Sequence, residues 1–297
     1  MPGPWVLRPP LSTARGGLDS VVDVDGRIYA IGGFGTGFDP IHKSVEVRDP
    51  ITEQWTFGEP MSMPRGNPGA AYADGRIYVV GGAVGKMNNT NKGESFDLST
   101  KKWTRIRNRP RGPILGPGAA AFDGRVYIIG GAERGLGPKG ITNAVSIYEP
   151  ATDKWSDVEP MPTARYLLRA VELDGQIYAV GGAVADGQPF SDALERYDPA
   201  ADTWSKLHPM SVGRGNPGVA AVDGQIFAVG GAGGVLGSAA PRKTVEQYDP
   251  QTDVWAPSED LPVARASLSA ERGQGNTIVA FGGFEPAASA RVESRLA

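Results

Sequence analysis

The chain has 297 residues, with 30 Lys and Arg residues against 33 Asp and Glu residues and a formal net charge of −3. It has no cysteine and only two histidines, which excludes disulfides, thiolate catalysis and Cys-ligated metals. We therefore expect no metal and no other cofactor. The near-neutral balance argues against a nucleic-acid partner. No apolar stretch approaches the ~20 residues that span a bilayer, so no membrane partner is expected.

The first residues lack the basic region and apolar core of a signal peptide. We therefore predict a soluble cytoplasmic protein, while a processed secreted form stays open. We expect a monomer. The 42 Gly and 25 Pro residues are typical of an all-β chain with many turns.

A Gly-Gly pair follows an apolar run six times along the chain. The pairs begin at Gly32, Gly81, Gly130, Gly181, Gly230 and Gly282, in steps of 49 to 52 residues. A tryptophan keeps the same period, at Trp55, Trp103, Trp155, Trp204 and Trp255. Two independent markers at one period indicate an internal repeat.

Each repeat predicts four short strands. In the first repeat they cover about 18–24, 27–33, 44–48 and 54–57. The Asp25-Gly26 pair predicts a tight hairpin between the first two, because glycine tolerates the positive φ that a type I′ turn requires. Four-stranded units repeated around an axis form a β-propeller. The sequence thus predicts an all-β, six-bladed β-propeller.

The sixth repeat lacks its tryptophan strand. After Gly282-Gly283 only one further strand is expected, at about 290–296. Trp5 lies 50 residues before Trp55, so residues 3–8 carry the missing strand. We predict a single domain, 1–297, in which 262–297 plus 3–8 form blade six and the N-terminal strand closes the ring.

The repeat resembles the kelch motif. The stretch Thr244–Pro250, followed by Thr252 and Trp255, is among its clearest copies, and the resemblance covers essentially the whole chain. It implies that the loops after the Gly-Gly pairs and after the tryptophan strands share one face. Ligands are then expected at the central mouth of that face, because loops on rigid scaffolds carry function.

Each linker after a tryptophan strand carries an arginine. The six are Arg15, Arg65, Arg111, Arg165, Arg214 and Arg265. Six guanidinium groups around one mouth would bind carboxylates or phosphates in a bidentate manner. The alternative is structural, because glutamates recur on the third strands as possible partners: Glu46, Glu94, Glu195, Glu246 and Glu293.

The residues just after these arginines are further ligand-binding candidates. Asn67 and Asn216 belong to two copies of Arg-Gly-Asn-Pro-Gly, and their amides could donate and accept hydrogen bonds unless the motif only supplies turns. Small residues there would leave the mouth open. Tyr166 is the only aromatic residue at its position, and Arg169 replaces a glycine of other repeats.

The loops after the Gly-Gly pairs add eight cations against five anions. The cations are Lys43, Lys86, Lys92, Arg134, Lys139, Arg242, Lys243 and Arg291, and the anions are Asp39, Glu133, Asp186, Asp192 and Glu285. This excess favours an acidic peptide or protein, or a small anionic ligand, as the partner.

We favour a binding scaffold that recognises such a partner at an arginine-rimmed mouth. The alternative is a metal-free isomerase, mutarotase or cyclase acting on a small carboxylate-bearing substrate, with Arg169 and Tyr166 in the site. The resemblance extends to copper oxidases and iron-dependent nitrile specifiers, but the chain lacks their metal ligands. The sialic acid mutarotase type of propeller stays open.

Overall fold

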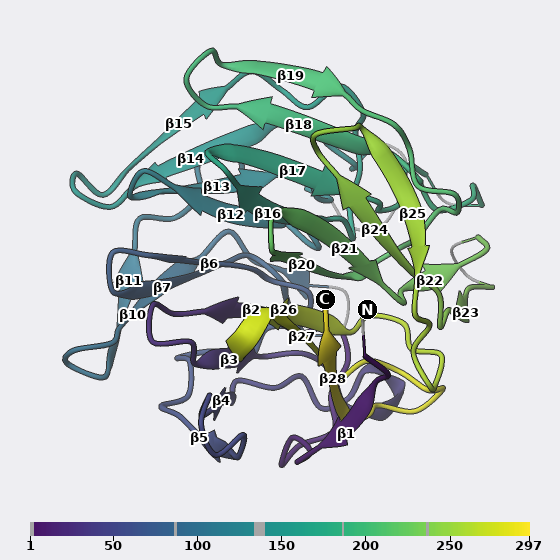
Figure 1. Ribbon diagram of the computed structural model, residues 1–297. Coiled ribbons are helices and arrows are strands. Elements are labelled where there is room, and N and C mark those ends of the chain that lie inside the picture. The colour runs from purple at the N-terminus through teal and green to yellow at the C-terminus, as the bar shows by residue number, and fades with distance from the viewer. Residues whose placement is uncertain (1–2, 86–87, 134–139, 186, 236–237) are drawn as a thin grey trace.

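Six four-stranded antiparallel sheets surround a central axis (Figure 1). This computed structural model describes residues 3–85, 88–133, 140–185, 187–235 and 238–297. The innermost strands, β2, β6, β12, β16, β20 and β26, contact one another in that order, and β26 contacts β2 again. The predicted six-bladed β-propeller is therefore confirmed.

Blade one contains β2 (Asp19–Val22), β3 (Ile28–Ile31), β4 (Val45–Arg48) and β5 (Trp55–Phe57). Blade two contains β6 (Gly69–Ala73), β7 (Arg76–Val80), β10 (Gly93–Asp97) and β11 (Lys102–Ile106). Blade three contains β12 (Gly118–Phe122), β13 (Arg125–Ile129), β14 (Val145–Glu149) and β15 (Lys154–Val158). Blade four contains β16 (Arg169–Leu173), β17 (Gln176–Val180), β18 (Leu194–Asp198) and β19 (Thr203–Lys206).

Blade five contains β20 (Gly218–Val222), β21 (Gln225–Val229), β24 (Val245–Asp249) and β25 (Val254–Ser258). Blade six contains β26 (Ser269–Arg272), β27 (Thr277–Phe281), β28 (Val292–Leu296) and β1 (Val6–Arg8). Two loop ribbons, β8 (Ala83–Gly85) with β9 (Asn88–Asn89) and β22 (Ala232–Gly233) with β23 (Ala240–Pro241), and two short 3₁₀ turns, η1 (Thr36–Phe38) and η2 (Gln274–Asn276), complete the elements.

Burial falls from the second strand of each blade toward the rim. All four residues of β3 are buried, whereas two of the three residues of β5 are exposed. Second strands are covered on both faces by neighbouring blades, which explains their continuous apolar sequences. In one such cluster Tyr29 and Ile31 of blade one pack against Ile77 and Val79 of blade two.

The Asp-Gly hairpins have the predicted geometry in blades two to five. In blade two Asp74 has φ 48° and Gly75 has φ 75°, as a type I′ turn requires. In blade one only Gly26 has a positive φ. There the Asp23 carboxylate accepts hydrogen bonds from the backbone N–H groups of Asp25 and Arg27, both at 2.9 Å, so a side chain holds this turn.

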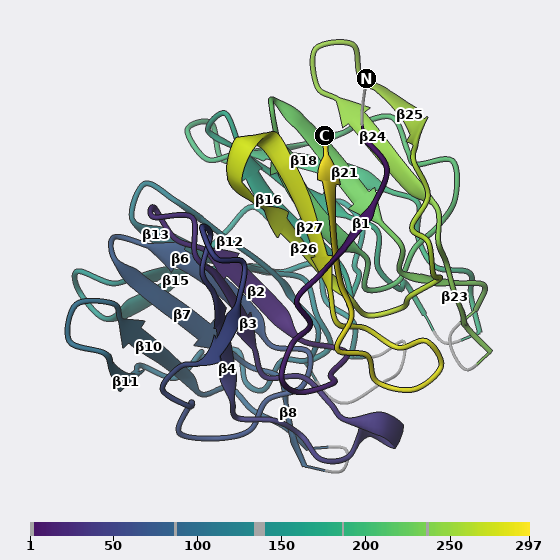
Figure 2. The same cartoon turned by 60° about the horizontal axis from the view of Figure 1, so that its bottom comes forward.

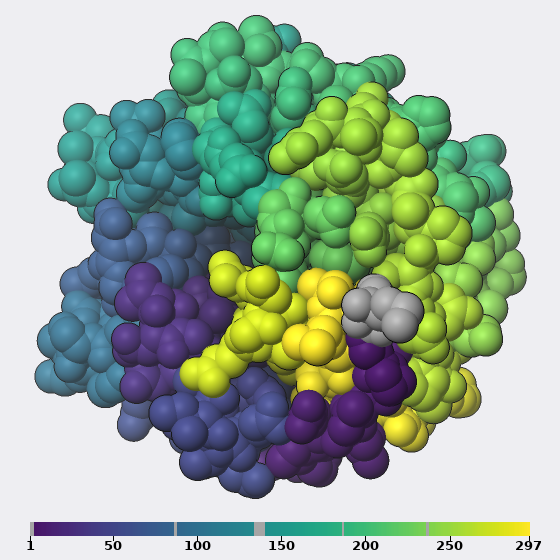
Figure 3. Space-filling model, in the orientation of Figure 1, coloured from purple at the N-terminus to yellow at the C-terminus, as the bar shows by residue number. Residues whose placement is uncertain are grey.

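The two faces of the ring differ in their loops. The hairpins between first and second strands and the chain termini lie on one face, here called the hairpin face, at the top of Figure 2. The loops after the Gly-Gly pairs, with β8 and β23, lie on the opposite face, here called the long-loop face. The hairpin face is hollowed near its centre (Figure 3).

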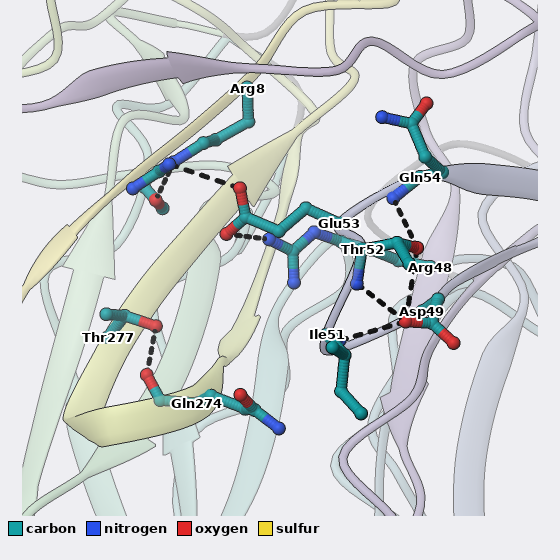
Figure 4. Close-up of polar contacts among 10 residues, drawn as sticks. Arg8, Arg48, Asp49, Ile51, Thr52, Glu53, Gln54, Gln274 and Thr277 are labelled. Carbon is teal, nitrogen blue, oxygen red and sulfur yellow. Dashed lines mark hydrogen bonds and ion pairs between the residues drawn. The ribbon is translucent and has the colours of Figure 1, made fainter.

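The N-terminal strand closes the ring as predicted. β1 pairs with β28 in antiparallel register, Val6 opposite Ser294. Trp5 joins the core cluster between blades five and six, and the Arg295 guanidinium lies 5.5 Å from its ring centre. Arg8 and Arg48 both contact the carboxylate of Glu53, at 3.1 and 2.8 Å, which ties β1 to blade one (Figure 4).

We expect Trp5→Ala to lower the free energy of unfolding by about 3–5 kcal/mol, because it empties a buried site that an indole fills. Leu7→Ala on the same strand is the matched control, since Leu7 is 65% exposed and should change stability by less than about 0.5 kcal/mol. Urea denaturation of both variants measures the difference. Equal losses would show that Trp5 does not secure the closure.

Candidate functional site

Five of the six candidate arginines are fully buried in ion pairs. They are Arg15, Arg65, Arg165, Arg214 and Arg265. Each guanidinium lies 2.7–3.2 Å from the glutamate on the third strand of its own blade. Burial lowers the pKa of each arginine, and the glutamate opposes that shift. Because these guanidinium groups are sealed from solvent, they do not line an open mouth. They lie where the structural alternative places them, paired with the glutamates of the third strands.

Arg65 shows how this group joins two blades. Its Nη1 donates to the carbonyl oxygen of Gly81 in its own blade at 2.7 Å, and its own carbonyl accepts the N–H of Gly33 from blade one at 2.8 Å. A Cβ on Gly32 would lie 2.3 Å from that same carbonyl oxygen. The Gly-Gly pair is therefore required where the linker of the next blade approaches.

Blade three departs from this arrangement. Ile114, and not Arg111, occupies the arginine position, because its carbonyl accepts the N–H of Gly82 at 2.8 Å. Ser146 stands where the other third strands have glutamate. At these two positions the cation and the anion are thus absent together, while another arginine of the same linker, Arg109, is buried and contacts Glu133 at 2.9 Å. Arg111 lies at the surface between Glu133 and Asp157, at 3.1 and 3.3 Å.

This substitution suggests a double-mutant test in blade two. Arg65→Ile or Glu94→Ser alone should cost about 3–5 kcal/mol of unfolding free energy, because each leaves a buried charge without its partner. The double variant, which copies blade three, should lose less than the sum by at least about 2 kcal/mol.

Urea denaturation of the cycle measures this coupling. Arg125→Ala and Glu149→Ala provide the control, because that pair is largely exposed and should couple by less than about 1 kcal/mol. Additive losses in blade two would mean that the arginine and the glutamate act separately.

The central mouth of the long-loop face is closed by apolar side chains. A Cβ added to Gly16, Gly66 or Gly215 would lie 2.0–2.4 Å from the ring of Phe284, Phe34 or Phe190, respectively. The small residues therefore admit aromatic rings instead of leaving an opening. Tyr166 is fully buried in the same apolar cluster as Phe34 and Phe190.

Beneath this layer Asn67 and Asn216 meet across the axis. Asn216 Nδ2 donates to Asn67 Oδ1 at 2.8 Å, which joins blades two and five on opposite sides of the ring. Both residues have positive φ, 45° and 46°. The Asn67 N–H donates to Gly17 and its carbonyl accepts from Gly116, so the linkers also bond around the axis. One hydrogen bond thus joins the two amides within this chain.

Arg169 makes a second bridge across the axis, from blade four to blade one. Its Nη1 lies 2.5 Å from Asp19 Oδ1, and its other nitrogens donate to the carbonyls of Leu18 and Pro217. Asp19 also accepts the N–H of Ala70. Burial raises the pKa of Asp19, while the Arg169 charge acts to lower it. Arg169, a candidate ligand-binding residue, thus has a carboxylate of this chain as its partner.

A cavity of about 40 Å³ lies beside this bridge. Its polar lining includes Asp19, Ser20, Arg169, Ser269 and Glu271. The Ser20 hydroxyl lies 2.6 Å from both Ser269 Oγ and Glu271 Oε1. Burial raises the pKa of Glu271 to about 7, and the Asp19 charge adds to the shift.

Sequence reasoning missed Glu271. The composition of the innermost strands could have revealed it. At the corresponding positions the innermost strands of most other blades contain mainly Gly, Ala and Val. Asp19, Arg169 and Glu271 interrupt that set, and the ring arrangement brings them to one cavity.

The Glu271 carboxyl should make stability depend on pH. Its folded pKa of about 7 exceeds the ordinary 4.5, so stability is lost as pH rises from 4.5 through 7. Glu271→Gln should therefore raise the unfolding free energy by roughly 1–3 kcal/mol above pH 7 and by almost nothing near pH 4. Urea denaturation across this range tests it, with exposed Glu159→Gln as control. A gain independent of pH would contradict it.

Two residues on the long-loop face break a local pattern. Thr90, Thr142, Ser191 and Ser289 occupy one loop position in four blades, and each hydroxyl accepts a backbone N–H two residues later. His42 and Arg242 stand at this position in the other two blades. His42 Nε2 and Arg242 Nε are buried without a hydrogen bond to any described residue. Burial, then the Arg15 charge, lowers the pKa of His42.

Phe38 is the exposed aromatic residue of this face. It is 65% exposed, and its ring meets Phe34 and Phe284 edge-on, with centroids 5.4 and 5.5 Å apart. Its φ of 65° lies in the left-handed region, which is uncommon for an aromatic residue. The sequence shows that these loops contain phenylalanines. The spacing of the repeats does not show that Phe38 of blade one contacts Phe284 of blade six.

Several of the predicted loop charges are paired. Arg291 contacts Glu285, and Lys243 contacts Asp260. Lys43 and Lys92 are exposed and form no ion pair with any described residue. Lys86, Arg134, Lys139 and Asp186 lie outside the described residues. Within the described ranges no helix is long and apolar enough to cross a membrane, and no group of three potential metal ligands gathers.

A family model described as the KLHDC2/KLHL20/DRC7 Kelch-repeats domain matches residues 18–231, and a Kelch motif model matches residues 213–262. Beta-scruin of Limulus polyphemus is 29% identical over 168 residues, which are 53% of this chain and 18% of that protein. Kelch-like protein 35 of Mus musculus is 26% identical over 173 residues, 58% of this chain and 28% of that protein. The match thus spans less than a third of either relative.

The solved structure of YjhT superposes on this chain with a TM-score of 0.80 and 17% sequence identity. The superposition covers 96% of this chain and 95% of that one. At this identity the likeness extends to the fold.

Proposed function

Because this chain belongs to the kelch-repeat family, whose propellers commonly bind proteins, we propose that it binds an acidic segment of a partner protein on its long-loop face. The observation that carries the proposal is the exposed Phe38 ring, supported from below by Phe34 and Phe284. Exposed aromatic residues on a packed base are the usual centre of a protein interface. The left-handed backbone of Phe38 adds support, because such strain concentrates at functional sites.

The charge of the partner is inferred from Arg242. Its guanidinium forms no ion pair with any described residue, and its Nε lies 2.2 Å from the place a Cβ of Gly233 would take. Glycine there lets the flat group lie on the backbone of its own loop. A carboxylate from a partner would pair with the terminal nitrogens of this half-buried guanidinium. The exposed Lys43 and Lys92 add positive charge to the same face.

Continuous contacts link Arg242 to the aromatic group. Arg242 pairs with Arg265 through the backbone, and the next residue, Ala266, pairs with Phe284. Phe284 in turn contacts Phe38. We therefore place the binding surface over blades five, six and one. This assignment replaces the arginine rim with Phe38 and Arg242, while Asn67, Asn216 and Tyr166 support the surface from beneath.

The closed mouth supports binding over catalysis in the same place. A small carboxylate entering from the long-loop face would meet the aromatic rings before it reached Arg169. Arg169 is already engaged by Asp19 and two carbonyl groups, and Tyr166 is buried.

Selection of displayed random peptides on the immobilised protein tests the proposal. We expect the selected peptides to combine Asp or Glu with an apolar residue. Phe38→Ala and Arg242→Ala should each weaken the selected peptides by about 10-fold or more, as measured by fluorescence anisotropy.

The matched controls are Phe57→Ala and Arg105→Ala. Phe57 is 62% exposed on the outer strand of blade one, and Arg105 is exposed on the outer strand of blade two. Neither should change the affinity. Selected peptides without acidic residues would overturn the charge assignment, and full affinity in Phe38→Ala would overturn the placement of the surface.

A further inference from the structure

Among the described residues, bridging side chains and an apolar cluster cover the long-loop side of the channel cavity. On its long-loop side the Asn67–Asn216 and Asp19–Arg169 bridges cross the axis from different pairs of blades. The apolar cluster around Phe34 and Phe190 covers both. On the other side the described surface is hollowed at its centre (Figure 3). All six inner strands contribute to the cavity, which holds about 40 Å³.

The cavity has a carboxylate without a cation. Arg169 is held by Asp19 and by the carbonyls of Leu18 and Pro217, so its charge is already matched. Glu271 receives one hydrogen bond, from Ser20. The groups that face it are Asp19, Arg169, Ser20 and Ser269. Burial raises the pKa of Glu271, the Ser20 hydrogen bond and the Arg169 charge act to lower it, and the Asp19 charge adds to the rise. An entering cation would reverse that effect by favouring the ionised form.

A separate groove lies nearer the hairpin face, along two of the strands that line the cavity. It has a volume of about 430 Å³ and is lined by Val24, Tyr72 and Phe122, among others. Tyr72 and Ala121 lie two residues beyond Ala70 and Ala119, which line the cavity, on β6 and β12. Two residues of a strand advance about 7 Å, so the groove and the cavity are stacked along the same strand faces. This length suits an aliphatic side chain.

The rim of the groove is acidic. Asp74 and Asp123, at the tips of two hairpins, line it and form no ion pair with any described residue. The arginines that follow them in sequence are matched elsewhere, Arg76 by Asp97 and Arg125 by Glu149. The groove thus combines an acidic rim, apolar walls and a carboxylate at its base.

We propose that the hairpin face is a second binding site, which takes a lysine side chain from a basic segment of a partner protein. The ammonium group enters the channel cavity and contacts Glu271 and the Ser269 hydroxyl, while the aliphatic stem lies between Tyr72 and Phe122. Lysine fits better than arginine because the cavity of about 40 Å³ can hold a compact group such as an ammonium, which is close to a water molecule in size. The planar guanidinium of arginine is larger than an ammonium. The partner segment is basic because Asp74 and Asp123 flank the entrance.

Titration of the ¹³C-methyl-labelled protein with the peptide acetyl-Ala-Phe-Lys-Phe-Ala-amide tests the proposal by NMR. The methyl groups of Ala70, Ala119 and Ala270 line the cavity and report occupancy directly. We expect their signals to shift with the lysine peptide, and to stay in place when norleucine or Nε-acetyl-lysine replaces the lysine. Binding should strengthen from about pH 6 to pH 8 as Glu271 ionises.

Variants of the carboxylates complete the test. Glu271→Gln keeps the acceptor for Ser20 and should weaken the lysine peptide by about 10-fold or more, and Asp74→Asn with Asp123→Asn should weaken it by a smaller factor. Glu159→Gln is the control, because Glu159 is exposed in the linker between blades three and four. It should leave the affinity unchanged. Equal shifts with the norleucine peptide, unchanged affinity in Glu271→Gln, or no cavity shift with the lysine peptide would each overturn the proposal.

Discussion

The joint between neighbouring blades depends on a buried guanidinium. A Gly-Gly bend turns carbonyl groups into the interior, where an unpaired acceptor is costly. In five blades an arginine donates to the carbonyl of the first glycine, and a glutamate on the third strand neutralises its charge. The carbonyl of that arginine then accepts the N–H of the second glycine in the preceding blade, except where Ile114 does so. One residue therefore organises its own blade and attaches it to the blade before.

The ring brings residues together that are far apart in sequence, and this determines the two faces. Asn67 and Asn216 are separated by 149 positions, and Asp19 and Arg169 by 150, yet both pairs span the axis. Together with the aromatic layer they seal the channel on the long-loop side. On the opposite side the groove between the hairpins of blades two and three carries two aspartates that are unpaired among the described residues, Asp74 and Asp123, whereas the long-loop side presents Phe38 and the exposed Lys43 and Lys92.

The fold could be predicted because its signals are local and periodic. Strand positions, hairpins and the role of residues 3–8 all follow from spacing within one repeat. The arginines repeat as regularly, but spacing alone does not tell whether a side chain turns toward solvent or toward Glu94 in its own blade. The order of residues along the longer linker of blade three points to Arg111, whereas packing places Ile114 at the arginine position. The aromatic layer and Glu271 depend on contacts between blades, which no single repeat contains.

The closure of the ring has a consequence for the order of folding. β1 precedes every other strand of the propeller along the chain, whereas its partner β28 follows them all, and the two pair at Val6 and Ser294. Until β28 has been synthesised, the Trp5 ring has no complete core to enter, and β1 has no strand to hold Arg8 beside Glu53. Blades two to five can form in sequence during synthesis, whereas the seam between six and one is a contact of very high sequence separation. Such contacts form slowly, because the loop that they close is the longest in the molecule.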